Sequence, residues 1–212
     1  MVSAEITDAV RKAIASAKER KFRETVELAI NLTDVDLSNP KNRVEEEIIL
    51  PKGRGKEAKV VVFGGGDIAL KSKNVADLVI YPEDIDKLAE DKKKAKKLAN
   101  SYHFFIAEAS LMPHIGKKLG MILGPRGKMP KPIPPQADVS SLIKALKQSV
   151  RVRSRDKMTF HTSVGIRTMP VEDIAENIEA VLKRIEGKLE KGRMNLSSVF
   201  VKTTMGPSVR LI

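Results

Sequence analysis

The fold is decided close to the C-terminus, by the residues Ser197-Ser198-Val199-Phe200-Val201-Lys202-Thr203-Thr204-Met205-Gly206-Pro207-Ser208. Val199 and Val201 fall on one face of an extended chain, and Phe200, Lys202 and Thr204 fall on the other, because side chains alternate along a strand. This pattern predicts an amphipathic strand that buries its valines. The Gly206-Pro207 pair ends the strand and leaves backbone accessible to a partner.

The N-terminal part of the chain also contains an alternating strand next to an amphipathic helix. A helix with Thr7 as its N-cap is predicted first. An alternating strand follows, with Thr25 and Glu27 on its polar face and Val26, Leu28, Ile30 and Leu32 on its apolar face. Further strands are predicted over Val44–Leu50 and Met158–Gly165, and a long amphipathic helix is predicted to have Pro170 as its first residue.

The middle of the chain differs. Beyond a basic connector at Lys52–Lys56, the run Val60–Phe63 is continuously apolar, as in a strand of a parallel sheet that is buried on both faces. Further strands are predicted at Leu78–Ile80 and Phe104–Ala107. Helices are predicted from Pro82 through Leu98, from Pro113, and over Val139–Ser149. Strands that alternate with helices in this way indicate a doubly wound sheet.

We therefore predict an α/β protein of two domains. Residues 1–58 and 154–212 form a discontinuous α+β domain with a split β-α-β sheet, and residues 59–153 form an inserted Rossmann-like domain with a doubly wound parallel sheet. Two adjacent connectors between the domains would act as a hinge.

The amino-acid composition favours some classes of binding partner and excludes others. The 39 basic residues exceed the 27 acidic ones, and the resulting net charge of +12 favours nucleic acid or an anionic membrane surface as partner. No apolar run approaches the roughly 20 residues of a membrane span, and Met1–Glu5 does not resemble the start of a secretory signal. The lack of cysteine excludes disulfides and thiolate metal sites. An aromatic content of 4% favours folded RNA over a single strand held by stacked rings.

The segment Lys21–Glu27 allows two interpretations. It is an ordinary junction between helix and strand with Phe22 in the core, or Phe22 packs on a ribose or base while Thr25 and Glu27 accept hydrogen bonds from 2′-hydroxyls or amino groups. A carboxylate in so basic a chain would recognise hydrogen-bond donors rather than phosphates.

Three segments carry a family resemblance, namely Lys21-Phe22-Arg23-Glu24-Thr25-Val26-Glu27, Leu123-Gly124-Pro125-Arg126-Gly127-Lys128-Met129-Pro130 and Thr203-Thr204-Met205-Gly206-Pro207-Ser208. In order and spacing they resemble the L-one family of large-subunit ribosomal proteins, which belong to the mobile stalk beside the tRNA exit site. The segments Asn39–Arg43 and Gly127–Pro130 resemble archaeal members.

The resemblance implies a non-enzymatic ribosomal protein of the cytoplasm, monomeric when free and without cofactor. Its terminal domain would bind large-subunit ribosomal RNA, and a similar structure in its own messenger RNA would allow it to repress translation. The contact surface implied by the family includes Phe22, Thr25, Glu27, Thr204, Met205 and Gly206, with Lys21, Thr203 and Ser208 beside them. The inserted domain would face deacylated tRNA in the exit site and assist its release, with Arg126, Lys128 and Lys131 contacting the RNA backbone.

Two other classes are weighed against this hypothesis. A nucleotide-binding enzyme would need a phosphate loop, but Gly64-Gly65-Gly66-Asp67 lacks the Gly-x-Gly-x-x-Gly spacing and is better explained as a turn. An architectural DNA-binding protein would bind DNA and RNA equally at matched salt. The lone histidines His103, His114 and His161 are more typical of partly exposed side chains than of metal ligands.

Overall fold

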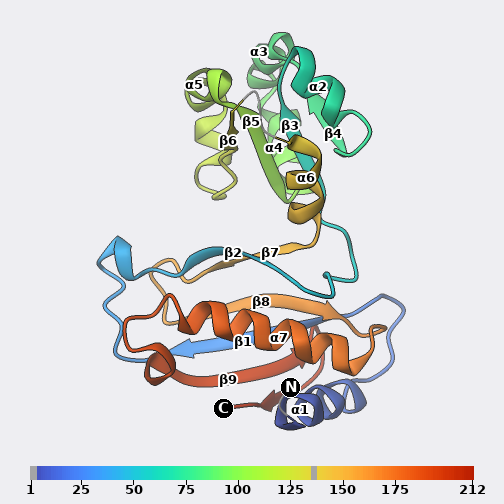
Figure 1. Ribbon diagram of the computed structural model, residues 1–212, viewed down its shortest axis with the longest axis vertical. Coiled ribbons are helices and arrows are strands. Elements are labelled where there is room, and N and C mark those ends of the chain that lie inside the picture. The colour runs from blue at the N-terminus through green and yellow to red at the C-terminus, as the bar shows by residue number, and fades with distance from the viewer. Residues whose placement is uncertain (1–3, 135–137) are drawn as a thin grey trace. The chain divides into compact units, whose positions relative to one another are not determined.

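The computed structural model describes residues 4–134 and 138–212 (Figure 1). Met1, Val2 and Ser3, part of the segment compared above with a secretory signal, lie outside the described residues. The chain folds as two compact units. One, here called the terminal unit, comprises Met1–Glu57 and Gln148–Ile212, and the other, here called the insert, comprises Ala58–Lys147.

The terminal unit is built on an antiparallel four-stranded sheet in the order β10-β9-β1-β8. Its strands are β1 (Thr25–Leu32), β8 (Thr159–Ile166), β9 (Leu196–Thr203) and β10 (Ser208–Arg210). Since β8 and β9 both run antiparallel to β1, they are parallel to each other, and α7 (Val171–Glu186) connects them as a split β-α-β unit. The strand β10 was not predicted from the sequence; here the chain after Pro207 turns back so that Ser208 pairs with Lys202.

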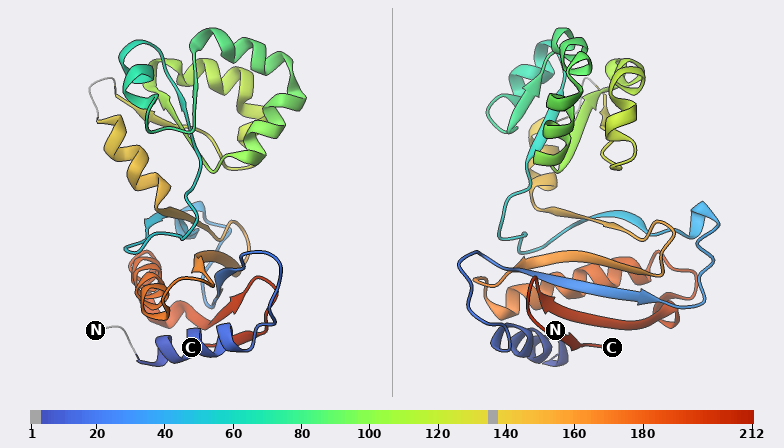
Figure 2. Two further views of the ribbon diagram at one scale, coloured as in Figure 1. Left: turned by 90° about the vertical axis from the view of Figure 1, so that its right-hand side faces the viewer. Right: turned by 180° about the vertical axis from the view of Figure 1, so that it is seen from behind.

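One face of this sheet forms the core of the terminal unit. The alternating residues Val26, Leu28 and Ile30 of β1 are fully buried and pack in one cluster with Ile174 and Ile178 of α7. The helix α1 (Ala4–Ala15) contributes Ile6, Val10 and Ala13 to the same cluster. In the view from behind, β1 and β9 lie in front of α7, so their other face points away from that helix (Figure 2).

A two-stranded ribbon adds to this core and corrects one predicted domain boundary. The strand β7 (Ser149–Arg153), which the sequence analysis assigned to the inserted domain, pairs with β2 (Glu45–Ile49) of the terminal unit. Val150 and Val152 alternate with arginines and pack into the terminal core. Arg153 Nε lies 3.0 Å from Glu45 Oε1 across the ribbon. The boundary therefore lies before Ser149 and not after Arg153.

The insert contains a parallel sheet in the order β4-β3-β5-β6. Its strands are β3 (Val60–Phe63), β4 (Leu78–Ile80), β5 (Phe104–Glu108) and β6 (Lys131–Ile133). Its helices are α2 (Gly66–Ser72), α3 (Pro82–Glu90), α4 (Lys92–Ser101), α5 (Met112–Leu123) and α6 (Val139–Lys147). Two apolar clusters cover its two faces, one with residues of α3, α4 and α5 and the other with residues of α2 and α6. The α/β class and the doubly wound arrangement are thus as predicted.

Several helix limits differ from the prediction. The single helix expected from Pro82 through Leu98 is broken, because the Asp91 carboxylate accepts the Lys93 and Lys94 N–H groups and caps a new helix, α4. Thr7 lies inside α1 and is not its cap. Pro170 is the N-cap of α7, and the glycine run leads into α2 instead of a simple turn. Short 3₁₀ helices occur at Pro40–Asn42, Ala109–Leu111 and Gly192–Asn195.

Candidate nucleic-acid interface

The start of β1 and the end of β9 meet at one end of the terminal sheet, because the two strands run antiparallel. The Thr204 N–H donates to Thr25 O at 3.0 Å, and the Thr25 N–H donates to Thr204 Oγ1 at 3.2 Å. Thr204 Oγ1 also lies 3.2 Å from Thr25 O and 3.4 Å from Glu27 Oε1. The structure therefore joins three of the predicted site residues from opposite parts of the chain in one hydrogen-bonded group.

The apolar side chains predicted for this site are exposed. Phe22 is 52% exposed and Met205 is 59% exposed. The interpretation that places Phe22 in the core is therefore wrong, because Phe22 lies in the loop before β1 and the first core position of that strand belongs to Val26. Lys21 and Ser208 are also exposed. Large apolar groups beside polar ones at a strand end are suited to packing on a sugar or base.

Thr203 differs from its neighbour Thr204. Thr203 is fully buried, and its Oγ1 donates to Glu24 Oε1 at 3.5 Å. The alternation along β9 turns it inward with Val201, while Thr204 is half-buried at the outer face. The Thr203 side chain is therefore not available for the RNA contact suggested for it, and it supports the turn from inside.

Gly206 packs closely within the same turn. Its N–H donates to Thr203 O at 3.1 Å. A Cβ at this position would collide with Thr203 Oγ1 and lie 3.1 Å from Ala17 Cβ. Only glycine allows the turn to lie this close to the residues that follow α1.

The outward face of the sheet continues the polar surface beyond the predicted residues. Lys202 pairs with Glu27, and Phe200 pairs with Ala29. Further along, Asn31 Nδ2 donates to Ser198 Oγ at 2.8 Å, and Thr159 Oγ1 donates to Asn31 Oδ1 at 2.7 Å. The alternation in β1 and β9 already placed most of these side chains on one face, but it could not show that β8 adds Thr159 to the same row.

The candidate residues of the insert are engaged within the protein. Lys128 Nζ donates to Ala99 O at 2.7 Å and to Tyr102 O at 2.6 Å, at the C-terminal end of α4. Arg126 donates to Asn100 Oδ1 at 3.1 Å and to Ile122 O at 2.9 Å, near the end of α5. Cations at these ends complement the helix dipoles and the last carbonyls. Arg126 and Lys128, for which RNA backbone contacts were suggested, are thus half-buried and bonded within the insert, whereas Lys131 is exposed on β6.

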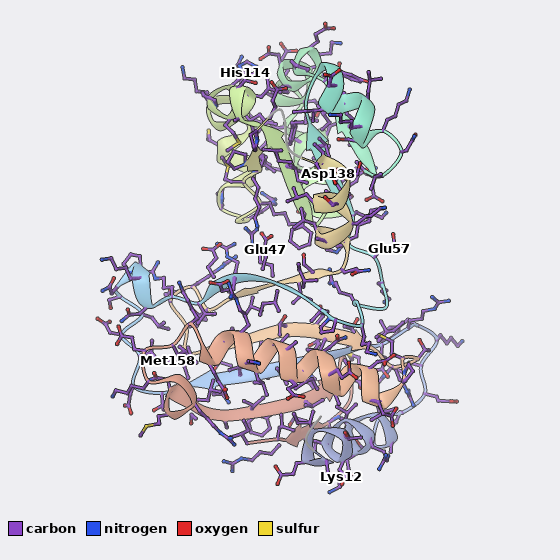
Figure 3. All side chains as sticks on the ribbon, in the orientation of Figure 1. Lys12, Glu47, Glu57, His114, Asp138 and Met158 are labelled. Carbon is purple, nitrogen blue, oxygen red and sulfur yellow. The ribbon has the colours of Figure 1, made fainter. Side chains whose placement is uncertain are left out.

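The histidines do not gather. His161 is exposed on β8, and His103 Nδ1 accepts the Lys59 N–H at 3.1 Å. His114 lies on α5 with its Nε2 3.3 Å from Asp86 Oδ1 (Figure 3). Within the described residues, no group of three or more histidine or acidic side chains could hold a metal ion. Over the same residues, no helix combines the length and apolar character needed to cross a membrane.

Comparisons with known proteins agree with the resemblance of the motifs. The family described as ribosomal protein L1p/L10e matches residues 11–207. The large ribosomal subunit protein uL1 of Methanocella arvoryzae is 55% identical over the whole length of both chains. Its namesake from Thermoplasma volcanium is 56% identical, covering 98% of this chain and 95% of its own. The uL1 protein of Archaeoglobus fulgidus is 53% identical, covering 98% of this chain and 97% of its own. Since the family match spans nearly all of the sequence and these relatives are archaeal, the chain belongs to the ribosomal protein L1p/L10e family in its archaeal form.

Proposed function

We propose that this protein is a structural component of the large ribosomal subunit whose terminal unit binds a folded segment of large-subunit ribosomal RNA. The observation that supports this most strongly is the hydrogen-bonded group of Thr25, Glu27 and Thr204, flanked by exposed Phe22 and Met205. The family consists of ribosomal structural proteins and not enzymes, so the nucleotide-binding enzyme is withdrawn as an alternative.

The chemistry of the surface suits sugar edges and bases. Backbone carbonyls, threonine hydroxyls and the Glu27 carboxylate accept hydrogen bonds from 2′-hydroxyls, the groups that distinguish RNA from DNA. Phe22 and Met205 offer apolar contact area beside them. The excess of basic residues supplies general attraction to phosphates, which carries no sequence information.

The insert has its own role in this proposal. It contains 16 basic and 9 acidic residues, a net charge of +7, and α4 presents exposed Lys92, Lys93, Lys96 and Lys97. This charge supports contact with the backbone of deacylated tRNA at the exit site and assistance to its release. The two connectors between the units would serve as the hinge of that movement.

The proposal also includes repression of translation from the protein's own messenger RNA. A surface that recognises the shape and 2′-hydroxyls of a folded RNA binds any RNA that presents the same fold. A messenger segment of similar structure would therefore compete for the same residues, with the free protein acting as a monomer.

Binding measurements with matched variants test the ribosomal RNA site. Thr204→Val keeps the volume of the side chain but removes the hydroxyl, and Phe22→Ala removes the exposed ring. We expect each to weaken binding to the folded ribosomal RNA fragment by about tenfold. The RNA groups opposite the changed side chain would lose a hydrogen bond or an apolar contact while remaining shielded from water. Thr7→Val on α1 is the control and should bind like wild type. Wild-type affinity in Thr204→Val and Phe22→Ala, with unchanged circular dichroism, would contradict the proposed site.

A further inference from the structure

A buried carboxylate lies directly beneath the candidate RNA surface. Glu24, one residue before β1, is only 2% exposed. Its Oε1 accepts the Met205 N–H at 3.3 Å and the Thr203 hydroxyl at 3.5 Å. Its Oε2 lies 3.2 Å from Arg167 Nη1. A charge removed from water in this way is tolerated only where opposite charge and hydrogen bonds compensate it.

Arg167 extends these contacts to two further segments. Its main-chain N–H donates to Glu24 O at 3.0 Å, which ties the end of β8 to the start of β1. Its guanidinium donates to Lys18 O at 3.1 Å and to Ala17 O at 3.2 Å, just beyond the end of α1. The pair therefore links the turn after β9, the start of β1, the end of β8 and the residues after α1.

We propose that Glu24, held by Arg167, is a positioning residue that fixes the Thr204–Gly206 turn in its RNA-binding geometry. This inference rests on the proposed ribosomal RNA site. Both groups that contact Glu24 Oε1 belong to this turn or to the residue that enters it. A buried ion pair adds little net stability compared with apolar packing. We therefore assign the Glu24–Arg167 pair the role of ordering the turn. A turn ordered before binding loses less conformational entropy when RNA docks.

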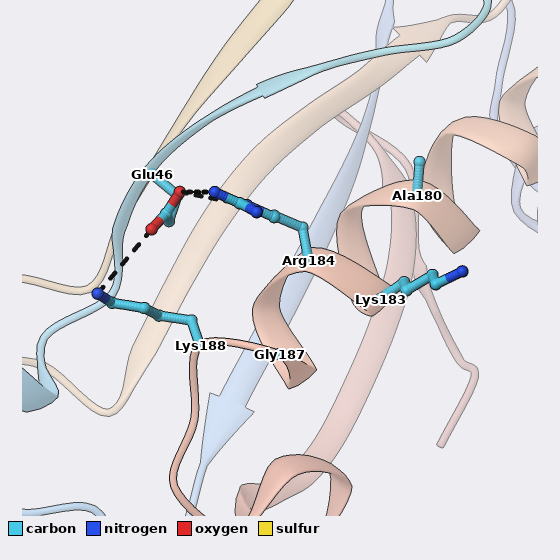
Figure 4. Close-up of a pocket in the computed structure, with 6 residues that line it drawn as sticks. All are labelled: Glu46, Ala180, Lys183, Arg184, Gly187 and Lys188. Carbon is cyan, nitrogen blue, oxygen red and sulfur yellow. Dashed lines mark hydrogen bonds and ion pairs between the residues drawn. The ribbon is translucent and has the colours of Figure 1, made fainter.

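A partly buried carboxylate elsewhere in the terminal unit provides a control. Glu46 of β2 lies 2.9 Å from Arg184 Nη2 and 4.0 Å from Lys188 Nζ, in a pocket also lined by Ala180, Lys183 and Gly187 (Figure 4). Glu24→Gln and Glu46→Gln each remove one negative charge from an ion pair with arginine. The change in net charge, on which general attraction to phosphates depends, is therefore the same in both variants.

The test compares the two full-length variants in three measurements. These are affinity for the folded ribosomal RNA fragment, affinity for an arbitrary RNA duplex, and hydrogen exchange of the Met205 amide without RNA. We expect Glu24→Gln to bind the fragment about tenfold more weakly than Glu46→Gln, because hydrogen bonds to charged groups are worth about that factor. Duplex affinity should be equal in the two variants. Exchange at Met205 should be faster in Glu24→Gln alone.

Each other result has a defined meaning. Equal fragment affinity and equal Met205 exchange in the two variants would overturn the positioning role. A wild-type protein that binds the fragment no better than the duplex would refute the proposed ribosomal RNA site, and Met205 exchange would still show whether Glu24 orders the turn. Should Glu24→Gln fail to fold, Arg167→Gln, at a side chain that is 25% exposed, takes its place. Its control is then Arg184→Gln, the partner of Glu46, because both variants remove one positive charge from an ion pair with glutamate.

Discussion

Two adjacent threonines illustrate how much a single position decides. Thr203 and Thr204 have the same side chain, yet Thr203 is fully buried against Glu24 and Thr204 is half-buried beside Thr25 and Glu27. The period of two along a strand turns one inward and the next outward. One hydroxyl therefore supports the site, and the other forms part of its surface.

Gly206→Ala should lower the free energy of unfolding by about 1–3 kcal/mol, the usual cost of overpacking. The added methyl collides with the Thr203 hydroxyl and approaches Ala17. Urea denaturation measures the change. The control is Gly116→Ala in α5, where a Cβ meets no atom within 4 Å, and it should stabilise by about 0.5–1 kcal/mol. A neutral Gly206→Ala would show that the turn is not tightly packed.

Local capping overrides apolar periodicity at the scale of elements. Apolar residues continue at helical spacing from α3 into α4, but Asp91 interrupts them by accepting the N–H groups of Lys93 and Lys94. An acidic N-cap is a strong start signal even within a longer periodic pattern. Two short helices thus replace one, and the lysines of α4 begin a new exposed face.

The same cap predicts a pH dependence. The hydrogen bond from the Lys94 N–H, together with the charge of that lysine, holds the pKa of Asp91 below its ordinary value. Because the folded state favours the ionised carboxylate, its contribution to α4 is complete above the ordinary pKa and is lost as pH falls through the lowered one. Carboxyl carbon NMR should give a midpoint below that of an unstructured aspartate. In the wild type, the amide signals of Lys93 and Lys94 should shift with the same midpoint, and in Asp91→Asn this shift should disappear. A wild-type Asp91 midpoint at the ordinary value would contradict the cap.

At the scale of the whole molecule, the charge and the site make separable contributions to binding. The net charge of +12 attracts any polyphosphate, whereas the group at Thr25, Glu27 and Thr204 acts only on a partner that fits it. For an arbitrary duplex, the logarithm of the affinity should fall with the logarithm of salt concentration by about 0.9 per neutralised phosphate. Binding to the folded fragment should show a shallower slope, measured by titration at several salt concentrations. Equal slopes would refute the distinction.

The two-unit organisation predicts that the insert can be removed. The Ala58 N–H donates to Lys147 O at 3.1 Å, so the two ends of the insert lie side by side. The terminal unit has its own apolar core. A chain in which a short glycine linker joins Glu57 to Gln148 should fold and keep its affinity for the ribosomal RNA fragment within about threefold. Circular dichroism and titration measure both properties. Loss of folding would show that the terminal unit depends on the insert.

The sequence by itself determined most of the helices and strands, their buried faces and the α/β class, because periods of two and 3.6 residues are local properties that each segment carries alone. It also singled out the segments that the structure joins at the start of β1 and the end of β9. It misplaced β7 and missed β6 and β10, since strand pairing depends on partners elsewhere in the chain.

Only the tertiary structure decided which polar side chains remain available. Arg126 and Lys128 looked like exposed cations in a proline-rich loop, but helix ends remote in sequence engage them. Glu24 carried no prediction from the sequence, yet it is buried against Arg167, which lies 143 residues away. The physical reason is that desolvation and hydrogen-bond pairing depend on which groups the fold brings within about 3 Å of one another, and no local pattern encodes that distance.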